Sequence, residues 1–230
     1  GASETTLMRL TTAYAMLVNG GKRITPTLID RIQDRNGRTV FRHDLRECTK
    51  CRAKVWAGQL PPEVPDDREH VTDAGSAYQV VDMLKGVVER GTGRRIAKLG
   101  IPLAGKTGTT NKGRDTWFIG FSTDLAVGVF AGFDIPKPLG RRETGSSVAA
   151  PIFRDFMAEA LKTEPAIPFR IPPNIRLVRV DATTGRRAES DTNNVILEAF
   201  KPGTVPTRIG EVLEGQSWTA AGAASAGTTL

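Results

Sequence analysis

The spacing of apolar residues along the chain predicts a layer of helices. Hydrophobic side chains recur at helical intervals in three segments, residues 5–19, 73–90 and 148–162. Glycines follow the first two, at Gly20-Gly21 and Gly91-Thr92-Gly93, and glycine commonly ends a helix. Thr72 or Asp73 is suited to cap the second segment, because a side-chain oxygen at that position accepts a hydrogen bond from the first helical turn.

Shorter apolar runs predict strands. Three of them follow one another closely, at about 103–109, 117–121 and 125–133. The links between them, Asn111–Asp115 and Ser122–Asp124, are short enough for antiparallel neighbours. Earlier in the chain, Asn36-Gly37 lies between two further β-like runs and predicts a separate hairpin. Helices packed on an antiparallel sheet make this an α+β fold.

Polar and proline-rich stretches suggest where the main domain is interrupted and where it ends. Residues 42–71 are a polar insert, and a proline-rich link begins after Thr163. A β segment at 175–181 and turns at 183–185 and 200–203 follow this link. We predict three parts: residues 1–163 as the main domain, 164–218 as an extension with short β segments, and 219–230 as a disordered tail rich in alanine and glycine.

Composition narrows the classes of partner. Lys and Arg number 32 against 25 Asp and Glu, a formal charge of +7, and such a balance favours anionic partners. The basic residues are scattered in pairs, however, and aromatic residues make up 6% of the chain, so nucleic-acid binding is not expected. No apolar run approaches the roughly 20 residues of a membrane-spanning helix.

Cys48 and Cys51 form a C-x-x-C pair with three interpretations. A redox motif would need a preceding strand and a helix start at the first cysteine, and the polar flanks lack that pattern. A zinc site needs about four ligands, and His43 and His70 match no standard spacing. We favour a local disulfide or two free thiols in a loop, with both histidines on the surface and no metal site.

The strongest candidate for chemistry is a lysine among small residues near the end of a predicted strand, in the run Ala104-Gly105-Lys106-Thr107-Gly108-Thr109-Thr110. Strand side chains alternate between faces, so we expect the side chain of Lys106 on one face of the sheet and those of Thr107 and Thr109 on the other. Gly108 lacks a Cβ and lets a ligand lie close to the backbone. A strand edge here can add an extended peptide, and hydroxyls with an ammonium suit a carboxylate-ended substrate.

The K-T-G sequence is one of three motifs of penicillin-binding proteins and β-lactamases, with S-x-x-K and S-D-N. The run 105–111, followed by 115–121, resembles the third motif of class A penicillin-binding proteins, which are bifunctional glycosyltransferase/transpeptidases. Residues 10–21 and 77–88 resemble that family's helices after the second motif and before the third, and 195–204 resembles its segment after the domain. The resemblance implies the C-terminal part of a transpeptidase domain with the penicillin-binding-protein/β-lactamase-like fold.

The resemblance also implies roles for the motif. The family cross-links peptidoglycan stem peptides through an acyl-serine, without a cofactor, at the periplasmic face of the inner membrane. Lys106 would bond with the second-motif serine, and Thr107 and Thr109 would hold the carboxylate of the stem peptide or of a β-lactam. The backbone N–H of Thr109 would be an oxyanion donor, and Gly108 and Thr110 would complete the substrate-binding strand.

Residues 1–230 lack the two serine motifs of the family, S-x-x-K and S-x-N. None of the eight has Lys three positions later or Asn two positions later. Both missing motifs, and the membrane anchor, are therefore expected in a part of the protein preceding Gly1, and this chain alone is expected not to acylate. Two alternatives stay open: a non-catalytic module that binds peptides or partners, and a serine β-lactamase, which the proline-rich extension and the basic insert fit less well.

Overall fold

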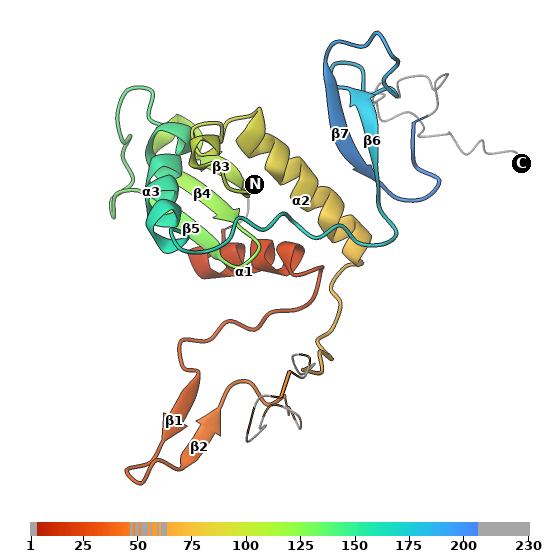
Figure 1. Ribbon diagram of the computed structural model, residues 1–230. Helices are drawn as coiled ribbons and strands as arrows, with labels where there is room; N and C mark the ends of the chain where they lie inside the picture. The colour runs from red at the N-terminus through yellow and green to blue at the C-terminus, as the bar shows by residue number, and fades with distance from the viewer. Residues whose placement is uncertain are drawn as a thin grey trace, which may run out of the picture. The chain divides into compact units, whose positions relative to one another are not determined.

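The computed structural model describes residues 4–46, 48, 51, 55, 57, 58, 60 and 64–206, and it confirms the α+β prediction (Figure 1). The α-helices are α1 (Leu7–Val18), α2 (Ala74–Glu89) and α3 (Ala150–Ala160). Shorter helical turns are η1 (Ala97–Leu99), η2 (Asn111–Gly113) and η3 (Gly145–Ala149). The chain divides into two compact units, Gly1–Ile175 and Arg176–Leu230, which are described separately.

The central sheet of the first unit contains the three predicted strands. These are β3 (Ala104–Thr109), β4 (Thr116–Phe121) and β5 (Ala126–Ala131). They pair antiparallel in the order β3-β4-β5, without a shift in register, so that Lys106 lies opposite Ile119 and Ile119 opposite Gly128. Among the described residues β3 is therefore an edge strand.

Opposite faces of the sheet are covered by different helices. Phe118 on β4 packs against Phe153 of α3, with ring centroids 4.7 Å apart. Phe121 points to the other face because it is three residues further along the strand, and there its ring meets Tyr14 of α1 at 6.4 Å. α2 joins this second face, where Val81 and Leu84 pack with Phe121. The sheet is thus buried on both sides.

Local capping explains where the helices begin. The Thr6 hydroxyl accepts from the Arg9 N–H at 3.2 Å, and the Asp73 carboxylate accepts from the Ser76 N–H at 2.9 Å. Asp73, rather than Thr72, is therefore the cap of α2. The third helical segment begins earlier than predicted, because the π turn at Gly145–Ala149 runs directly into α3 and is closed by a capping box between Thr144 and Ser147.

A long arm, residues 23–69, leaves the core between α1 and α2. It contains the predicted hairpin of β1 (Arg31–Gln33) and β2 (Thr39–Arg42). The base of the arm is closed by an antiparallel bridge between Lys22 and His70 and by an ion pair between Lys22 and Asp66. Hydrogen bonds from Arg68 and Lys22 hold the pKa of the Asp66 carboxyl well below its usual range, because they stabilise its ionised form.

A disulfide joins Cys48 and Cys51. The sequence favoured either a local disulfide or two free thiols, and the structure has the disulfide. His43 and His70 are exposed, as expected. Within the described ranges, no group of three or more His, Cys, Asp or Glu side chains is arranged to hold a metal ion. In the same part of the chain, no helix is both long and apolar enough to cross a bilayer.

The second unit is a two-stranded sheet of β6 (Arg176–Asp181) and β7 (Val195–Phe200). The turn predicted at 183–185 is confirmed, since the Asp181 carboxylate accepts from the Thr183 and Thr184 N–H groups at 2.7 and 3.0 Å. The link from 164 to 175 belongs to the first unit. The expected tail, 219–230, lies outside the described residues, and the three-part domain division stays a prediction.

Candidate functional site

The five residues singled out in the sequence lie together on β3 and directly after it. Lys106 is opposite Ile119 on β4, whereas Thr107 is opposite Phe118 and Thr109 is opposite Thr116. Residues directly opposite each other share a face of the sheet. The expected alternation is thus confirmed: Lys106 lies on the face of α1 and α2, and the two threonines lie on the face of α3.

Backbone groups of two of these residues point away from the sheet. The Thr110 N–H donates to the Asp115 carbonyl at 3.0 Å, so Thr110 and Asp115 are a hydrogen-bonded pair at the end of the β3–β4 ladder. In an antiparallel pair, hydrogen-bonded and non-hydrogen-bonded residues alternate. Thr107 and Thr109 therefore direct their N–H and C=O groups toward the free edge of β3, where no described strand pairs with them. That edge can accept an extended peptide.

Lys106 supplies positive charge at the same edge. Its side chain is exposed, and its Nζ donates to the Thr107 carbonyl at 2.8 Å. Because that carbonyl points outward, the ammonium lies along the edge that carries the Thr109 N–H. An ammonium beside outward-pointing N–H groups favours an anionic ligand or a developing oxyanion.

The two threonine hydroxyls are anchored by residues that the sequence analysis missed. The Thr109 Oγ1 accepts from the Gly145 N–H at 3.0 Å, and the Thr107 Oγ1 lies 2.7 Å from the Thr92 Oγ1. The Ser146 hydroxyl in turn donates to the Thr92 carbonyl at 2.8 Å. Thr92 and Gly145 are 15 and 36 residues from their partners, so no short-range pattern in the sequence signals these contacts.

Thr110 has a different environment from the other motif residues. Its Oγ1 accepts from the Asp115 N–H at 2.8 Å and lies 3.2 Å from the Asp115 Oδ2. These bonds close the turn between β3 and β4, in which Lys112 adopts a left-handed conformation with φ of 64°. A structural role in the turn accounts for the Thr110 hydroxyl, and its contact with a substrate stays a prediction.

Two glycines permit close packing around β3. A Cβ on Gly108 would lie 3.1 Å from the Trp117 Cβ, so this glycine accommodates the indole as well as leaving the backbone open. A Cβ on Gly145 would lie 2.5 Å from the Gly108 carbonyl oxygen and 2.6 Å from the Trp117 carbonyl oxygen. Both of these atoms belong to the sheet backbone, which cannot move aside cheaply.

Replacing Gly145 with alanine is expected to separate the π turn from β3. The forced shift would lower the free energy of unfolding by about 1–3 kcal/mol, as overpacking usually does. It would also move the backbone N–H of residue 145 away from the Thr109 hydroxyl to which it donates. The urea midpoint of the complete protein, followed by circular dichroism, measures the loss, and an unchanged midpoint would contradict the packing described.

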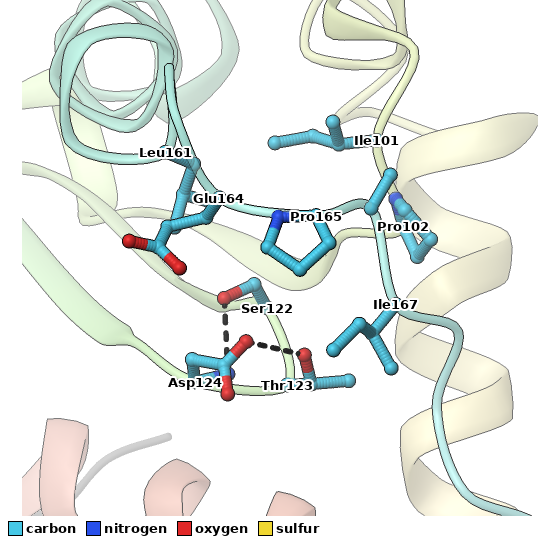
Figure 2. Close-up of a pocket in the computed structure, with 10 residues that line it drawn as sticks. Ile101, Pro102, Ser122, Thr123, Asp124, Leu161, Glu164, Pro165 and Ile167 are labelled. Atoms are coloured by element: carbon cyan, nitrogen blue, oxygen red, sulfur yellow. Dashed lines mark hydrogen bonds between the residues drawn. The ribbon is translucent and has the colours of Figure 1, made fainter.

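A shallow pocket lies at the other end of the sheet (Figure 2). It is lined by the β4–β5 turn and by the link that follows α3, including Ser122, Asp124 and Pro165. Its volume of about 10 Å³ suits about one water molecule. Thr116, which is opposite Thr109, lies six positions along the chain from Ser122 of the pocket, about 20 Å at 3.4 Å per residue, so the pocket is no part of the K-T-G site.

Known proteins are similar to this chain over most of its length. The family described as "Penicillin binding protein transpeptidase domain" matches residues 1–158. Penicillin-binding protein 1A of Rickettsia bellii is 48% identical over 205 residues, which are 87% of this chain and 25% of that protein. The corresponding protein of Pseudomonas aeruginosa is 34% identical over 245 residues, covering 94% of this chain and 30% of its own length.

A solved structure is similar over most of the chain. The crystal structure of penicillin-binding protein 1A from Haemophilus influenzae superposes with a TM-score of 0.72 at 27% identity. The match covers 90% of this chain and 33% of that one. This chain therefore spans about a quarter to a third of the length of the proteins it resembles.

Proposed function

Because the chain belongs to the penicillin-binding protein transpeptidase family, we propose that it forms the substrate-recognition side of a D,D-transpeptidase site that cross-links peptidoglycan stem peptides. The observation that carries this proposal is the free edge of β3. Along it lie the Lys106 ammonium and the outward backbone groups of Thr107 and Thr109. An extended peptide ending in a carboxylate fits such an edge through main-chain bonds and charge.

Each motif residue has a distinct role in this proposal. The hydroxyls of Thr107 and Thr109 donate to the terminal carboxylate of the stem peptide, or to the carboxylate of a β-lactam. The Thr109 N–H donates to the oxygen of the attacked carbonyl as negative charge develops there. Lys106 stabilises that charge and bonds with a serine of the second motif, while Gly108 and Thr110 shape the strand.

The reaction proceeds by nucleophilic catalysis. A serine oxygen attacks the carbonyl of the penultimate D-Ala, and the bond to the terminal D-Ala breaks as that residue leaves with a proton on its nitrogen. The amine of a second stem peptide then attacks the acyl-serine, forms the cross-link and returns the proton to the serine. A β-lactam would enter the same first step and stay attached.

The attacking serine is proposed to come from another part of a larger, bifunctional cell-wall synthase. No serine in the printed sequence is followed by Lys at three positions, and the curated relatives are about four times longer than the matched region. We place that serine, and a membrane anchor, in a segment preceding Gly1, with this domain on the periplasmic face of the inner membrane. The 230-residue chain is then inactive by itself.

A fluorescent penicillin tests the proposal directly. The complete protein is expected to become labelled on a serine outside residues 1–230, and excess unlabelled penicillin should prevent the labelling. The 230-residue chain, incubated in the same way, should stay unlabelled. A complete protein that resists labelling would rule out the transpeptidase, and labelling of the short chain would locate the nucleophile among its own eight serines.

The second candidate is a non-catalytic module with the same fold that binds peptides or partners. The observation behind it is again the free edge of β3, which can bind an extended peptide through main-chain hydrogen bonds without a nucleophile. This candidate predicts that the complete protein binds a stem peptide ending in D-Ala-D-Ala reversibly but never forms a covalent adduct. Mass spectrometry after incubation with penicillin separates the two candidates, since only an acyl-enzyme gains the mass of the drug.

A further inference from the structure

Thr92 lies beside the K-T-G strand although it belongs to none of the three motifs. It is the central residue of the turn Gly91-Thr92-Gly93, between α2 and β3. The N–H groups of both glycines donate to the Val87 carbonyl, at 3.2 and 2.9 Å, which fixes the turn to the end of α2.

A second element fixes Thr92 from the other side. The Ser146 hydroxyl, in the π turn that precedes α3, donates to the Thr92 carbonyl at 2.8 Å. Thr92 is therefore tied to α2 and to the start of α3 at once, while its own hydroxyl reaches the Thr107 Oγ1 at 2.7 Å. The end of α2, the strand β3 and the π turn before α3 therefore meet at Thr92 and its two neighbouring glycines.

The direction of these hydrogen bonds depends on what Thr107 contacts. A hydroxyl has one hydrogen to donate and two lone pairs that accept, and an ionised carboxylate only accepts. When the Thr107 hydrogen is directed to a carboxylate, the bond with Thr92 requires Thr92 as the donor. Thr109 is prepared in the same way, since its oxygen accepts the Gly145 N–H and its hydrogen stays available.

We propose that Thr92 is a positioning residue that orients the Thr107 hydroxyl as a donor to the substrate carboxylate. The inference rests on the proposed transpeptidase function and extends its recognition site by a residue outside the motifs. Ser146 supports Thr92 through its backbone. Thr92 does not itself touch the substrate, so its effect is confined to ligands that carry the carboxylate.

The test compares two ligands on variants of the complete protein. Thr92→Val keeps the branched shape and removes the hydroxyl, whereas Thr92→Ser keeps the hydroxyl. Acylation by benzylpenicillin and by its methyl ester is measured through competition with a fluorescent penicillin. Thr12→Val is the matched control, because the Thr12 hydroxyl is exposed on α1 and bonds to the Met8 carbonyl.

We expect Thr92→Val to slow acylation by benzylpenicillin about five- to tenfold, the size of one lost hydrogen bond that supports a charged group. The methyl ester should react with the variant and the wild type at rates within about twofold of each other, on the same reasoning. Thr92→Ser and Thr12→Val should match the wild type with both ligands.

Equal losses for the acid and the ester would show a merely structural role for Thr92 and overturn the inference, as would a Thr92→Val variant that reacts like the wild type. Either result leaves the transpeptidase function standing, because the wild type is acylated. A wild-type protein that penicillin does not acylate would instead overturn the proposed function, and the inference with it.

Discussion

Replacing Lys106 with methionine is expected to slow acylation of the complete protein by a fluorescent penicillin about 10²–10³-fold. Methionine keeps the length of the side chain but removes the positive charge from the free edge of β3. Electrostatic groups that face a developing oxyanion usually have effects of this size. The side chain is exposed and bonds only to its neighbouring carbonyl among the contacts described, so the loss is expected without unfolding.

Two further variants make the result specific. Lys98→Met removes an exposed lysine from η1, in the same unit, and should leave the acylation rate unchanged. Lys106→Arg keeps the positive charge and should therefore recover part of the acylation rate. It should not recover all of it, because a planar guanidinium does not fit at a close site in the way a compact ammonium does. If Lys106→Met reacts as fast as the wild type, the charge at this edge has no part in acylation.

Replacing Phe118 with alanine is expected to lower the free energy of unfolding of the domain by about 3–5 kcal/mol. Phe118 is fully buried between the sheet and α3, where it packs against Phe153. It also lies directly opposite Thr107, so the cavity would form beneath the K-T-G strand. The loss is measured as the urea concentration at which the complete protein ceases to be labelled by penicillin, since labelling requires the folded domain.

Phe130→Ala is the matched control for this cavity. Phe130 lies on the neighbouring strand β5 and packs against Trp117, but 45% of its surface is exposed. Its truncation removes less apolar contact and should shift the urea midpoint much less. Equal shifts for the two variants would mean that the fully buried ring beneath α3 is no more important for stability than the half-exposed ring of Phe130.

The secondary structure could be predicted because its signals are local. Helical spacing located α1 and α2, and of the two caps that the sequence offered for α2, Thr72 and Asp73, the structure has Asp73. Alternation within a strand was enough to place Lys106 and Thr107 on opposite faces. The Asn36-Gly37 turn indicated the hairpin in the arm.

The surroundings of the motif could not be predicted, because they depend on contacts between distant segments. Thr92 and Gly145 are ordinary turn residues in the sequence, and only folding brings them to the hydroxyls of Thr107 and Thr109. The early start of the third helix had a weak local signal, the pairing of Thr144 with Ser147, but serine is less typical there than an acidic residue.

Because the arm is closed at Lys22 and His70, its length does not affect the geometry of the central sheet. Both ends of the arm are joined there by backbone bonds, so residues added beyond that point do not pull on α1 or α2. The entropy of closing a loop grows slowly, by about 0.6 kcal/mol for each doubling of its length. Relatives can therefore gain or lose whole segments in the arm during evolution while β3 keeps its register.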